Sequence, residues 1–565
     1  MTAPGRGRIP WGNALEASAV LLVGLGFLAL KVYSLHPTLT DDWIYAYLAG
    51  RVGEGSWPHR DFFFAHPPVH LLALALVLKI TGFSVLAVRL VPALAAAASG
   101  LFIWAVARRH GGRLGAFAGW TVFLFSYDVL RSSSHITGAN LSLAFLAAGA
   151  WFCLDRRWIR GGALLALASL TALYTLPVIG GILGLLALRR PAGWRRAVSG
   201  FAAVFIGLQV AVALPAPGEY VDQVYLYHRD KPEQALENAQ TWSRAAAHQP
   251  AMAMALPVAA GASLALWLAK TKRVPGTGRG GRRRRPAERT GAAGARPAET
   301  DRPLLDLMGA GALLAAVQLV FLLRLPELYT YYLQLLYGLL SLLLGLGVAG
   351  WVRAVARIVR VRRDGSGLTE RVQGLIAGVL VTAAAAGLTE MWRPEPSDIY
   401  PVGRRVRYTW RDSPFPAAVD RWVRTWIWKD VRVTGEYVFS ATRYLWHESR
   451  GLDRVEAVAE EIRRSTAEGD RILGDSMLAP LVALTSGRRL VNDEADTNTK
   501  RFTTGMETMD QFIRRMDGED LAALVFMEGR FLDRFDGFQS WRAGAFPSVT
   551  RWEEGEEGIL VLARR

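Results

Sequence analysis

Long apolar runs separated by short basic clusters dominate the first 390 residues of this 565-residue chain. A helix that crosses a bilayer needs ~20 mostly apolar residues, because the hydrocarbon core is about 30 Å thick. The runs that meet this length without ambiguity are 14–33, 86–107, 114–130, 138–154, 197–214, 251–269, 304–323, 332–350 and 372–390. With 51% hydrophobic and only 20% charged residues, the chain is not a series of soluble domains. We expect a polytopic α-helical membrane protein.

The formal net charge of +17 is concentrated in this apolar part of the chain. Residues 391–565 are almost neutral, with 27 basic and 29 acidic side chains. The excess lies between the apolar runs, in clusters at Arg6/Arg8, Arg108/Arg109/Arg113, Arg156/Arg157/Arg160, Arg189/Arg190/Arg195/Arg196, the loop 270–303, and Arg353 through Arg371. Membrane proteins retain Lys and Arg on the cytoplasmic side. The charge therefore indicates topology, and not a nucleic-acid surface.

Two apolar stretches are ambiguous by length alone. The run 67–81 is short for a span, and the run 161–188 is too long for one comfortable span. All basic clusters lie on one side only if 67–81 does not cross and 161–188 crosses twice, as a tight hairpin turning near Tyr174–Pro177. We therefore expect about 11 spans, with interfacial or re-entrant helices in the first outer loop. The N-terminus is then cytoplasmic, the C-terminus lies outside, and the protein resides in the cell (plasma or inner) membrane.

The chain divides into a transmembrane domain, residues 1–390, and an outer domain, residues 391–565. The Gly/Ala/Arg/Pro-rich loop 270–303 of the first part is expected to be a disordered cytoplasmic loop. In the second part, residues 391–450 are rich in Trp, Tyr and Arg, which is typical of a segment at a membrane surface. Residues 453–565 combine a helical stripe with short apolar runs, which predicts a soluble α/β domain with a small parallel or mixed sheet.

Signals for metals and cofactors are weak. The single cysteine, Cys153, excludes a disulfide scaffold and a thiolate zinc cluster. No Gly-rich phosphate loop follows any predicted strand, so nucleotide binding has no support. A group of acidic residues in the outer domain could contact an acceptor or a cation, or could be solvated loop carboxylates: Asp475, Asp493, Glu494 and Asp496.

Ionisable residues next to spans are functional candidates in a membrane protein. The first outer loop carries Asp41 and Asp42 directly after the first span, then Arg60 and Asp61, then His66. Adjacent carboxylates repel each other, which raises the pKa of one of them and suits it to act as a general base. The alternative is that both are simply hydrated at the interface.

The stretch DDWIYAYLAGRVGEGSWPHRDFFFAHPPVHLLALAL resembles the first outer loop of GT-C superfamily glycosyltransferases. It is most similar to the protein-mannosyltransferase and aminoarabinose-transferase-like branch, glycosyltransferase family 39. That branch has an Asp-Glu pair, a Tyr, a PYRDF stretch and a Pro-Pro motif in this order. The corresponding residues are Asp41-Asp42, Tyr45, Pro58–Phe62 and His66-Pro67-Pro68. Weaker similarities lie at Tyr227–Arg229 and Leu328–Tyr332.

The resemblance implies an inverting transfer of a hexosyl or pentosyl group from a polyprenyl-phosphate donor to an acceptor glycan, lipid or protein outside the membrane. Asp41 stands in the family's catalytic position, with Asp42 beside it. Candidates for binding the donor phosphate or substrate are Arg60, Asp61, His66, His228, Arg229, Tyr331 and Tyr332, followed by Asp128, His135 and Lys231. No cofactor is required and no metal ligands are assigned, although a divalent cation at the acidic pair stays an alternative.

Two family positions differ in this chain. The Asp that many members carry just before the fourth span is replaced by an earlier Asp128, with His135 and Asn140 nearer that place. The Lys in the turn between the fifth and sixth spans is missing after Tyr174-Thr175. The sequence features also bear on three other functions. A secondary transporter is disfavoured because the spans hold few central charges and no paired repeats. A non-catalytic protein of the same fold is disfavoured by the acidic pair. An enzyme like the O-antigen ligases is a close neighbour of the favoured function.

Overall fold

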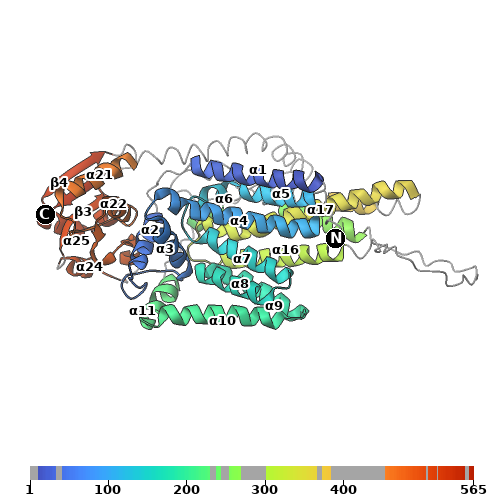
Figure 1. Ribbon diagram of the computed structural model, residues 1–565, viewed down its shortest axis with the longest axis horizontal. Coiled ribbons are helices and arrows are strands. Elements are labelled where there is room, and N and C mark those ends of the chain that lie inside the picture. Colours follow the sequence, from blue (N-terminus) through green and yellow to red (C-terminus); the bar gives the residue numbers. More distant parts are fainter. Residues whose placement is uncertain are drawn as a thin grey trace, which may run out of the picture.

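The computed structural model describes residues 11–33, 41–229, 237–242, 254–268, 301–364 and 372–382, and residues 452–565 with gaps at 504, 506, 518–519 and 554–558. Figure 1 shows a long bundle of helices with a smaller part of sheet and helices at one end. The bundle is built from helices within residues 11–33, 85–213, 255–268, 302–364 and 372–382, and the smaller part from the described residues of 452–565. The predicted interfacial segment 391–450 and most of the loop 270–303 lie outside the described residues.

Apolar helices along the long axis make up the bundle (Figure 1). They are α1 (Trp11–Tyr33), α4 (Val85–Gly111), α5 (Arg113–Leu124), α7 (Ala139–Leu154), α8 (Trp158–Thr171), α9 (Leu176–Arg189), α10 (Trp194–Ala213), α15 (Ala255–Leu268), α16 (Arg302–Leu322), α17 (Gln334–Asp364) and Val372–Thr382. In the described residues, α4, α10, α16 and the segment Thr330–Arg357 are long and apolar enough to cross a membrane. This is the helix content of a polytopic membrane protein. The number of spans stays a prediction.

The run predicted as a span at 114–130 is broken in the structure. Helix α5 ends at Leu124, Ser126 has an extended backbone, and a short helix α6 (Tyr127–Ser132) follows. The Ser126 hydroxyl donates to the carbonyl of Phe123, which satisfies an acceptor at the end of α5. The break redirects the chain towards the loop that holds His135.

The long run 161–188 turns where the sequence predicts it, through the 3₁₀ turn Leu173–Thr175. The two helices do not pair as a tight hairpin, because α8 packs against α7 and α10, whereas α9 packs mainly against α16. Glycines on α8 explain this choice. A Cβ at Gly161 would meet Cys153 of α7, and a Cβ at Gly162 would meet the backbone of Ala197 in α10. Both faces of α8 are therefore occupied by close helix neighbours, as is usual for small residues in membrane bundles.

The described start of α16 shortens the predicted loop 270–303. Asp301 precedes the helix, and Arg302 already lies within it. The buried Asp301 carboxylate forms ion pairs with Arg353 and Arg357 of α17. Helix α17 continues beyond the predicted end of its span at residue 350 and carries these arginines in register with Asp301.

Two short helices lie between the bundle and the smaller part (Figure 1): α2 (Asp42–Gly53) and α3 (Val69–Thr81). At about 1.5 Å per residue, the 13 residues of α3 span about 20 Å, which is short of the hydrocarbon thickness. Residues 42–49 of α2 are all buried. These helices form one apolar cluster with residues of the smaller part, such as Val455, Leu478 and Val482.

The smaller part is a five-stranded mixed sheet with the order β2-β1-β3-β5-β4. Strand β1 is parallel to β2 and β3, and β5 is antiparallel to β3 and β4. Its elements are α21 (Leu452–Ser465), β1 (Arg471–Gly474), α22 (Ala479–Ser486), β2 (Arg489–Leu490), α23 (Thr499–Thr503), α24 (Met509–Met516), β3 (Leu521–Met527), α25 (Asp536–Ala545), β4 (Ser548–Glu553) and β5 (Ile559–Arg564). Strand β3 is nearly buried throughout, as expected for a central strand covered on both faces.

Candidate active site

The two adjacent carboxylates Asp41 and Asp42 face different surroundings. Asp41 precedes α2 and lines a small polar cavity. The Asp42 side chain is only 1% exposed and forms an ion pair with Arg89 of α4 at 2.7 Å. Asp42 also contacts His135 Nδ1 at 3.1 Å and accepts a hydrogen bond from the backbone N–H of Ile136 at 2.6 Å. Asp42 thus ties the start of α2 to α4 and to the loop after α6, and Asp41 is the member of the pair that meets the cavity.

The cavity has a volume of about 50 Å³ and lies between residues 41–66, helix α12 (Tyr227–Arg229), the turn before α17 and a loop of the smaller part. Its polar lining comes from all four regions: Asp41, Tyr45, His66, Tyr227, His228, Tyr329, Tyr331, Tyr332, Asp496 and Asn498. The predicted candidates Asp41, His66, His228, Tyr331 and Tyr332 are therefore brought together, although they lie far apart in the sequence.

Two histidines and a tyrosine form one wall of this cavity. His66 Nε2 lies 3.1 Å from the Tyr45 hydroxyl, and the rings of His66 and His228 are 5.4 Å apart. His228 Nε2 lies 2.5 Å from the carbonyl oxygen of Ala65. Because a carbonyl only accepts, Nε2 of His228 carries a proton. Burial and the negative charges of Asp41 and Asp496 raise the pKa of Tyr45 far above its usual value, so Tyr45 stays a neutral hydrogen-bond donor.

A larger groove of about 360 Å³ shares this wall. Tyr45, His66, His228, Tyr331 and Tyr332 line both spaces. Beyond the wall the groove is mainly apolar and is lined by Pro67, Leu173, Leu176, Pro177, Phe321 and Leu325, with Glu327 at one side. The site thus has a polar compartment on the Asp41 side and an apolar compartment that extends between the ends of α8, α9 and α16.

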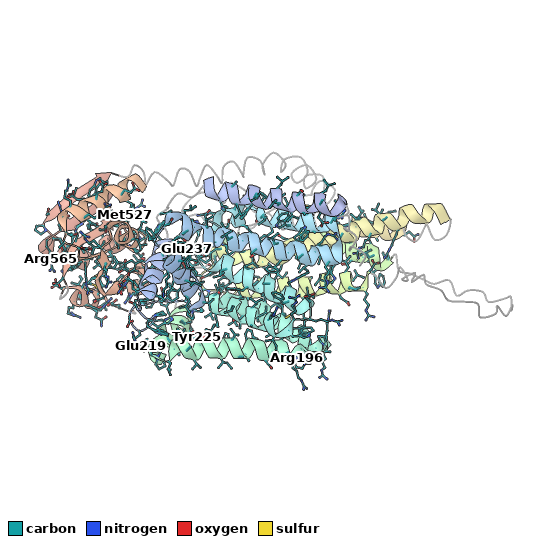
Figure 2. The ribbon with its side chains drawn as sticks, viewed as in Figure 1. Arg196, Glu219, Tyr225, Glu237, Met527 and Arg565 are labelled. Atoms are coloured by element: carbon teal, nitrogen blue, oxygen red, sulfur yellow. The ribbon has the colours of Figure 1, made fainter. Side chains whose placement is uncertain are left out.

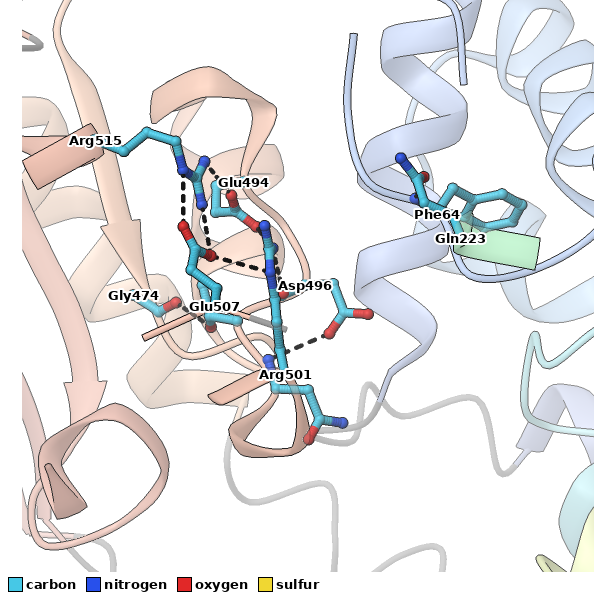
Figure 3. Close-up of polar contacts among 10 residues, drawn as sticks. Phe64, Gln223, Gly474, Glu494, Asp496, Arg501, Glu507 and Arg515 are labelled. Carbon is cyan, nitrogen blue, oxygen red and sulfur yellow. Dashed lines mark hydrogen bonds and ion pairs between the residues drawn. The ribbon is translucent and has the colours of Figure 1, made fainter. Parts of the chain in front are cut away.

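The loop 491–498 of the smaller part reaches the cavity with Asp496 and Asn498. Figure 3 shows Asp496 projecting from this loop towards the segment that carries Phe64. The Asn498 backbone N–H donates to the Asp496 carboxylate at 3.3 Å, and the Thr497 hydroxyl donates to the carbonyl of Gly474 at 2.8 Å. The hydrogen bond to Gly474, the last residue of β1, therefore fixes the loop and orients Asp496.

Ion pairs hold the same loop on both sides. Glu494 pairs with Arg501 at 2.5 Å and with Arg515 at 2.6 Å (Figure 3). Asp493 accepts from the Tyr47 hydroxyl of α2 at 2.8 Å and pairs with Arg51 of α2 at 2.7 Å. Of the acidic group in the smaller part, Asp493 and Glu494 thus contact arginines and a tyrosine, and Asp496 faces the cavity. Asp475 is buried and accepts from the backbone N–H groups of Met527 and Leu532.

Several predicted candidates lie elsewhere. Arg60 and Asp61 pair with each other at 2.7 Å on the surface, and hydrogen bonding from Arg60 lowers the pKa of Asp61. Arg229 is exposed at the end of α12 (Tyr227–Arg229). Asp128 is buried and accepts from the Tyr337 hydroxyl at 2.8 Å. None of these four side chains lines the cavity; His135 contacts Asp42 instead, and Lys231 lies outside the described residues.

Comparisons with known proteins bear on the fold of this chain. Residues 65–217 match the family model described as dolichyl-phosphate-mannose-protein mannosyltransferase. Among solved structures, ArnT from Cupriavidus metallidurans bound to undecaprenyl phosphate aligns over 98% of this chain and 98% of its own, with a TM-score of 0.53 and 15% identity. The apo form of that protein aligns over 97% and 98%, with a TM-score of 0.54 and 16% identity. The chain has the GT-C fold of the protein-mannosyltransferase and ArnT type. The predicted resemblance is confirmed at this level. A comparison with curated proteins found no match.

The GT-C fold positions residues that the sequence interpretation overlooked. Asn498 and Glu327 line the two compartments, but isolated loop residues of these types carry no sequence signal. Arg89 did carry one, because it interrupts an apolar run, and a charged residue in such a run needs a partner. Its partner is Asp42.

The described residues contain no group of three or more His, Cys, Asp or Glu side chains suited to a metal ion. Asp41 and Asp42 face different surroundings, so the pair does not form a joint ligand set. A divalent cation at the acidic pair therefore receives no support from the geometry.

Proposed function

We propose that the protein is an inverting glycosyltransferase that moves a hexosyl or pentosyl group from a polyprenyl-phosphate donor to an acceptor at the outer face of the membrane. One observation carries the proposal. Asp41 shares a polar cavity with His66 and His228, and the same two histidines line an adjoining apolar groove. A base, a phosphate-binding pair and a space for a lipid chain are thus adjacent.

The donor is proposed to bind across the shared wall. Its polyprenyl chain occupies the apolar groove near Leu173, Leu176 and Phe321. Its phosphate then lies against His66 and His228, whose ring N–H groups donate hydrogen bonds to it. The undecaprenyl phosphate bound to ArnT, a protein of the same fold, supports this class of lipid.

The transfer needs one displacement. A hydroxyl oxygen of the acceptor attacks the anomeric carbon from the side opposite the phosphate, and its proton passes to the Asp41 carboxylate. The bond between the anomeric carbon and the phosphate oxygen breaks at the same time, and the phosphate leaves with the bonding electrons. Histidine and tyrosine donors stabilise its charge. The configuration of the sugar inverts, because no covalent sugar–enzyme intermediate forms.

The remaining site residues divide between positioning and acceptor binding. Asp42 holds the start of α2 through Arg89 and so fixes the position of Asp41. Asp496 and Asn498 face the cavity from the outer part and are assigned to the hydroxyl groups of the acceptor or of the transferred sugar. The positive-inside rule, applied to the arginine clusters, supports a site on the outer side of the membrane. The N-terminus is then cytoplasmic, and residues 391–565 form the outer domain.

The test compares Asp41→Asn with wild type and with Asp61→Asn in the full chain. Asp61 belongs to the same outer loop but is paired with Arg60 away from the cavity, so it is a matched control. Membranes from cells that carry each variant are extracted, and polyprenyl-phosphate sugars are measured by mass spectrometry. We expect the sugar-loaded lipid to accumulate only in cells that carry Asp41→Asn, and not in wild-type or Asp61→Asn cells. Equal lipid profiles for wild type and Asp41→Asn would contradict the role of Asp41.

A further inference from the structure

A second large cavity lies in the half of the bundle that is farther from the proposed active site. It has a volume of about 600 Å³ and lies between α4, α7, α9, α16 and α17. Its interior is apolar and includes Ile103, Leu146, Ile182, Leu186, Leu307 and Leu342. This volume falls within the range of about 300–1,000 Å³ that is usual for ligand sites.

The cavity opens among arginines from three different segments. Arg156 follows α7, Arg189 ends α9 and Arg302 begins α16; all three are exposed and line the cavity. Among the described residues none of the three forms an ion pair. The single acidic residue in the lining is Asp306. The mouth is therefore positively charged, and an anionic group at this point would be attracted from several sides.

Arg156 occupies a backbone position that favours glycine, which suggests that its charge is needed there. Arg156 has φ +61° and ends α7 with hydrogen bonds from its own N–H to Cys153 and from the N–H of Arg157 to Phe152. This is the Schellman arrangement, in which glycine usually occupies the left-handed position. An arginine there is strained.

The length of the cavity matches one leaflet. Its lining on α7 runs from Leu143 to Leu154, which at about 1.5 Å per residue is about 16 Å, close to half of the ~30 Å hydrocarbon core. One wall, α9, is poorly covered by protein, since Val178 and Ile179 are its only buried residues among those described. The acyl chain of a lipid from one leaflet would fill the space between α9 and α7.

We propose that this cavity binds one anionic diacyl phospholipid from the leaflet on the arginine side, the cytoplasmic leaflet in the expected topology. The acyl chains lie between α7 and α9, and the headgroup phosphate contacts Arg156, Arg189 and Arg302. The bound lipid joins α9 and α16 to α4 and α7. This site is separate from the apolar groove near His66 and does not depend on the proposed transfer reaction.

The test uses the purified full chain in nanodiscs of phosphatidylcholine, with and without phosphatidylglycerol. Phosphatidylglycerol is expected to raise the melting temperature of the wild type, and native mass spectrometry to show one retained phosphatidylglycerol. The triple variant Arg156→Gln, Arg189→Gln, Arg302→Gln should bind it about a hundredfold more weakly, because each lost charge weakens anionic-lipid binding about fivefold.

Two further variants keep the test decisive. Arg160→Gln, Arg195→Gln, Arg196→Gln removes three exposed arginines that do not line the cavity; Figure 2 shows Arg196 on the arginine end of α10. This control should bind phosphatidylglycerol like the wild type. Ala310→Phe fills the cavity and should abolish the temperature shift with all arginines in place. Equal retention of both lipids, an equal loss in the control, or an unchanged shift in Ala310→Phe would each overturn the proposal.

Discussion

The neighbouring carboxylates Asp41 and Asp42 should give opposite phenotypes when each is changed to asparagine. Asp42→Asn removes the charge that faces Arg89, whose side chain is 1% exposed. Breaking a buried ion pair by removing one partner costs roughly 3–5 kcal/mol, because the other charge stays buried. Folding stabilities are typically about 5–15 kcal/mol. Asp42→Asn should therefore lower thermal stability strongly, whereas Asp41→Asn removes a charge from a polar cavity and should leave stability near wild type.

Activity should follow the reverse order. A general base contributes typically 10²- to 10⁴-fold to the rate, so Asp41→Asn should lower turnover at saturating donor by at least 10²-fold. Asp42→Asn should retain measurable turnover below its own melting temperature. The assay pairs a thermal melt of purified protein with turnover of an extracted polyprenyl-phosphate sugar at a temperature where both variants are folded.

A second change separates charge burial from other effects. Arg89→Met removes the charge that Asp42→Asn leaves behind, so the double variant should melt at a higher temperature than Asp42→Asn alone. The reasoning is refuted if Asp42→Asn melts like wild type and loses as much turnover as Asp41→Asn. It is also refuted if Asp41→Asn is the less stable of the two variants.

Three further predictions follow from the geometry. Asp496→Asn should raise the KM for the acceptor with a smaller effect on kcat, and an unchanged KM would remove Asp496 from the acceptor side. Burial lowers the pKa of His59 to about 4. Its neutral form therefore stabilises the fold above pH ~6.5, and this contribution is lost as the pH falls towards 4. The variant His59→Asn should show a weaker pH dependence of its melting temperature over this interval, and asparagine tolerates the left-handed backbone at this position. Gly119→Leu should destabilise the bundle by at least about 1–3 kcal/mol, because a Cβ at Gly119 meets the backbone of Ser341; a melting temperature like that of wild type would contradict this packing.

The bundle and the position of Asp41 could be predicted because their signals are local. Apolar runs of span length mark α4, α10 and α16 within a few residues. The turn that separates α8 from α9 lies where one is needed to keep all basic clusters on one side of the membrane. The divergence of these two helices could not be predicted in this way. It depends on which helices approach Gly161 and Gly162, and a single sequence does not specify those partners.

The candidate site was predictable only where a short motif carried it. His66 lies in the same loop as Asp41, and both reach the cavity. Arg60 also stands in that loop, but the neighbouring Asp61 neutralises it at the surface. The partner of Asp42 lies 47 positions further along, at Arg89, and such long-range pairs are set by helix packing.

Helix α2 connects the residue Asp41 to the part of the molecule that contains the sheet. Asp41 precedes this 12-residue helix, and Tyr47 and Arg51, which lie about two to three turns further on, both bind Asp493. Asp496 lies three residues after Asp493 in a loop that β1 supports. The separation between Asp41 and Asp496 is thus set by one rigid helix and one braced loop. Since these carboxylates line the same cavity, a displacement of the sheet part would change the surroundings of Asp496 and of Asp41 together. The sheet part therefore supplies one wall of the candidate site.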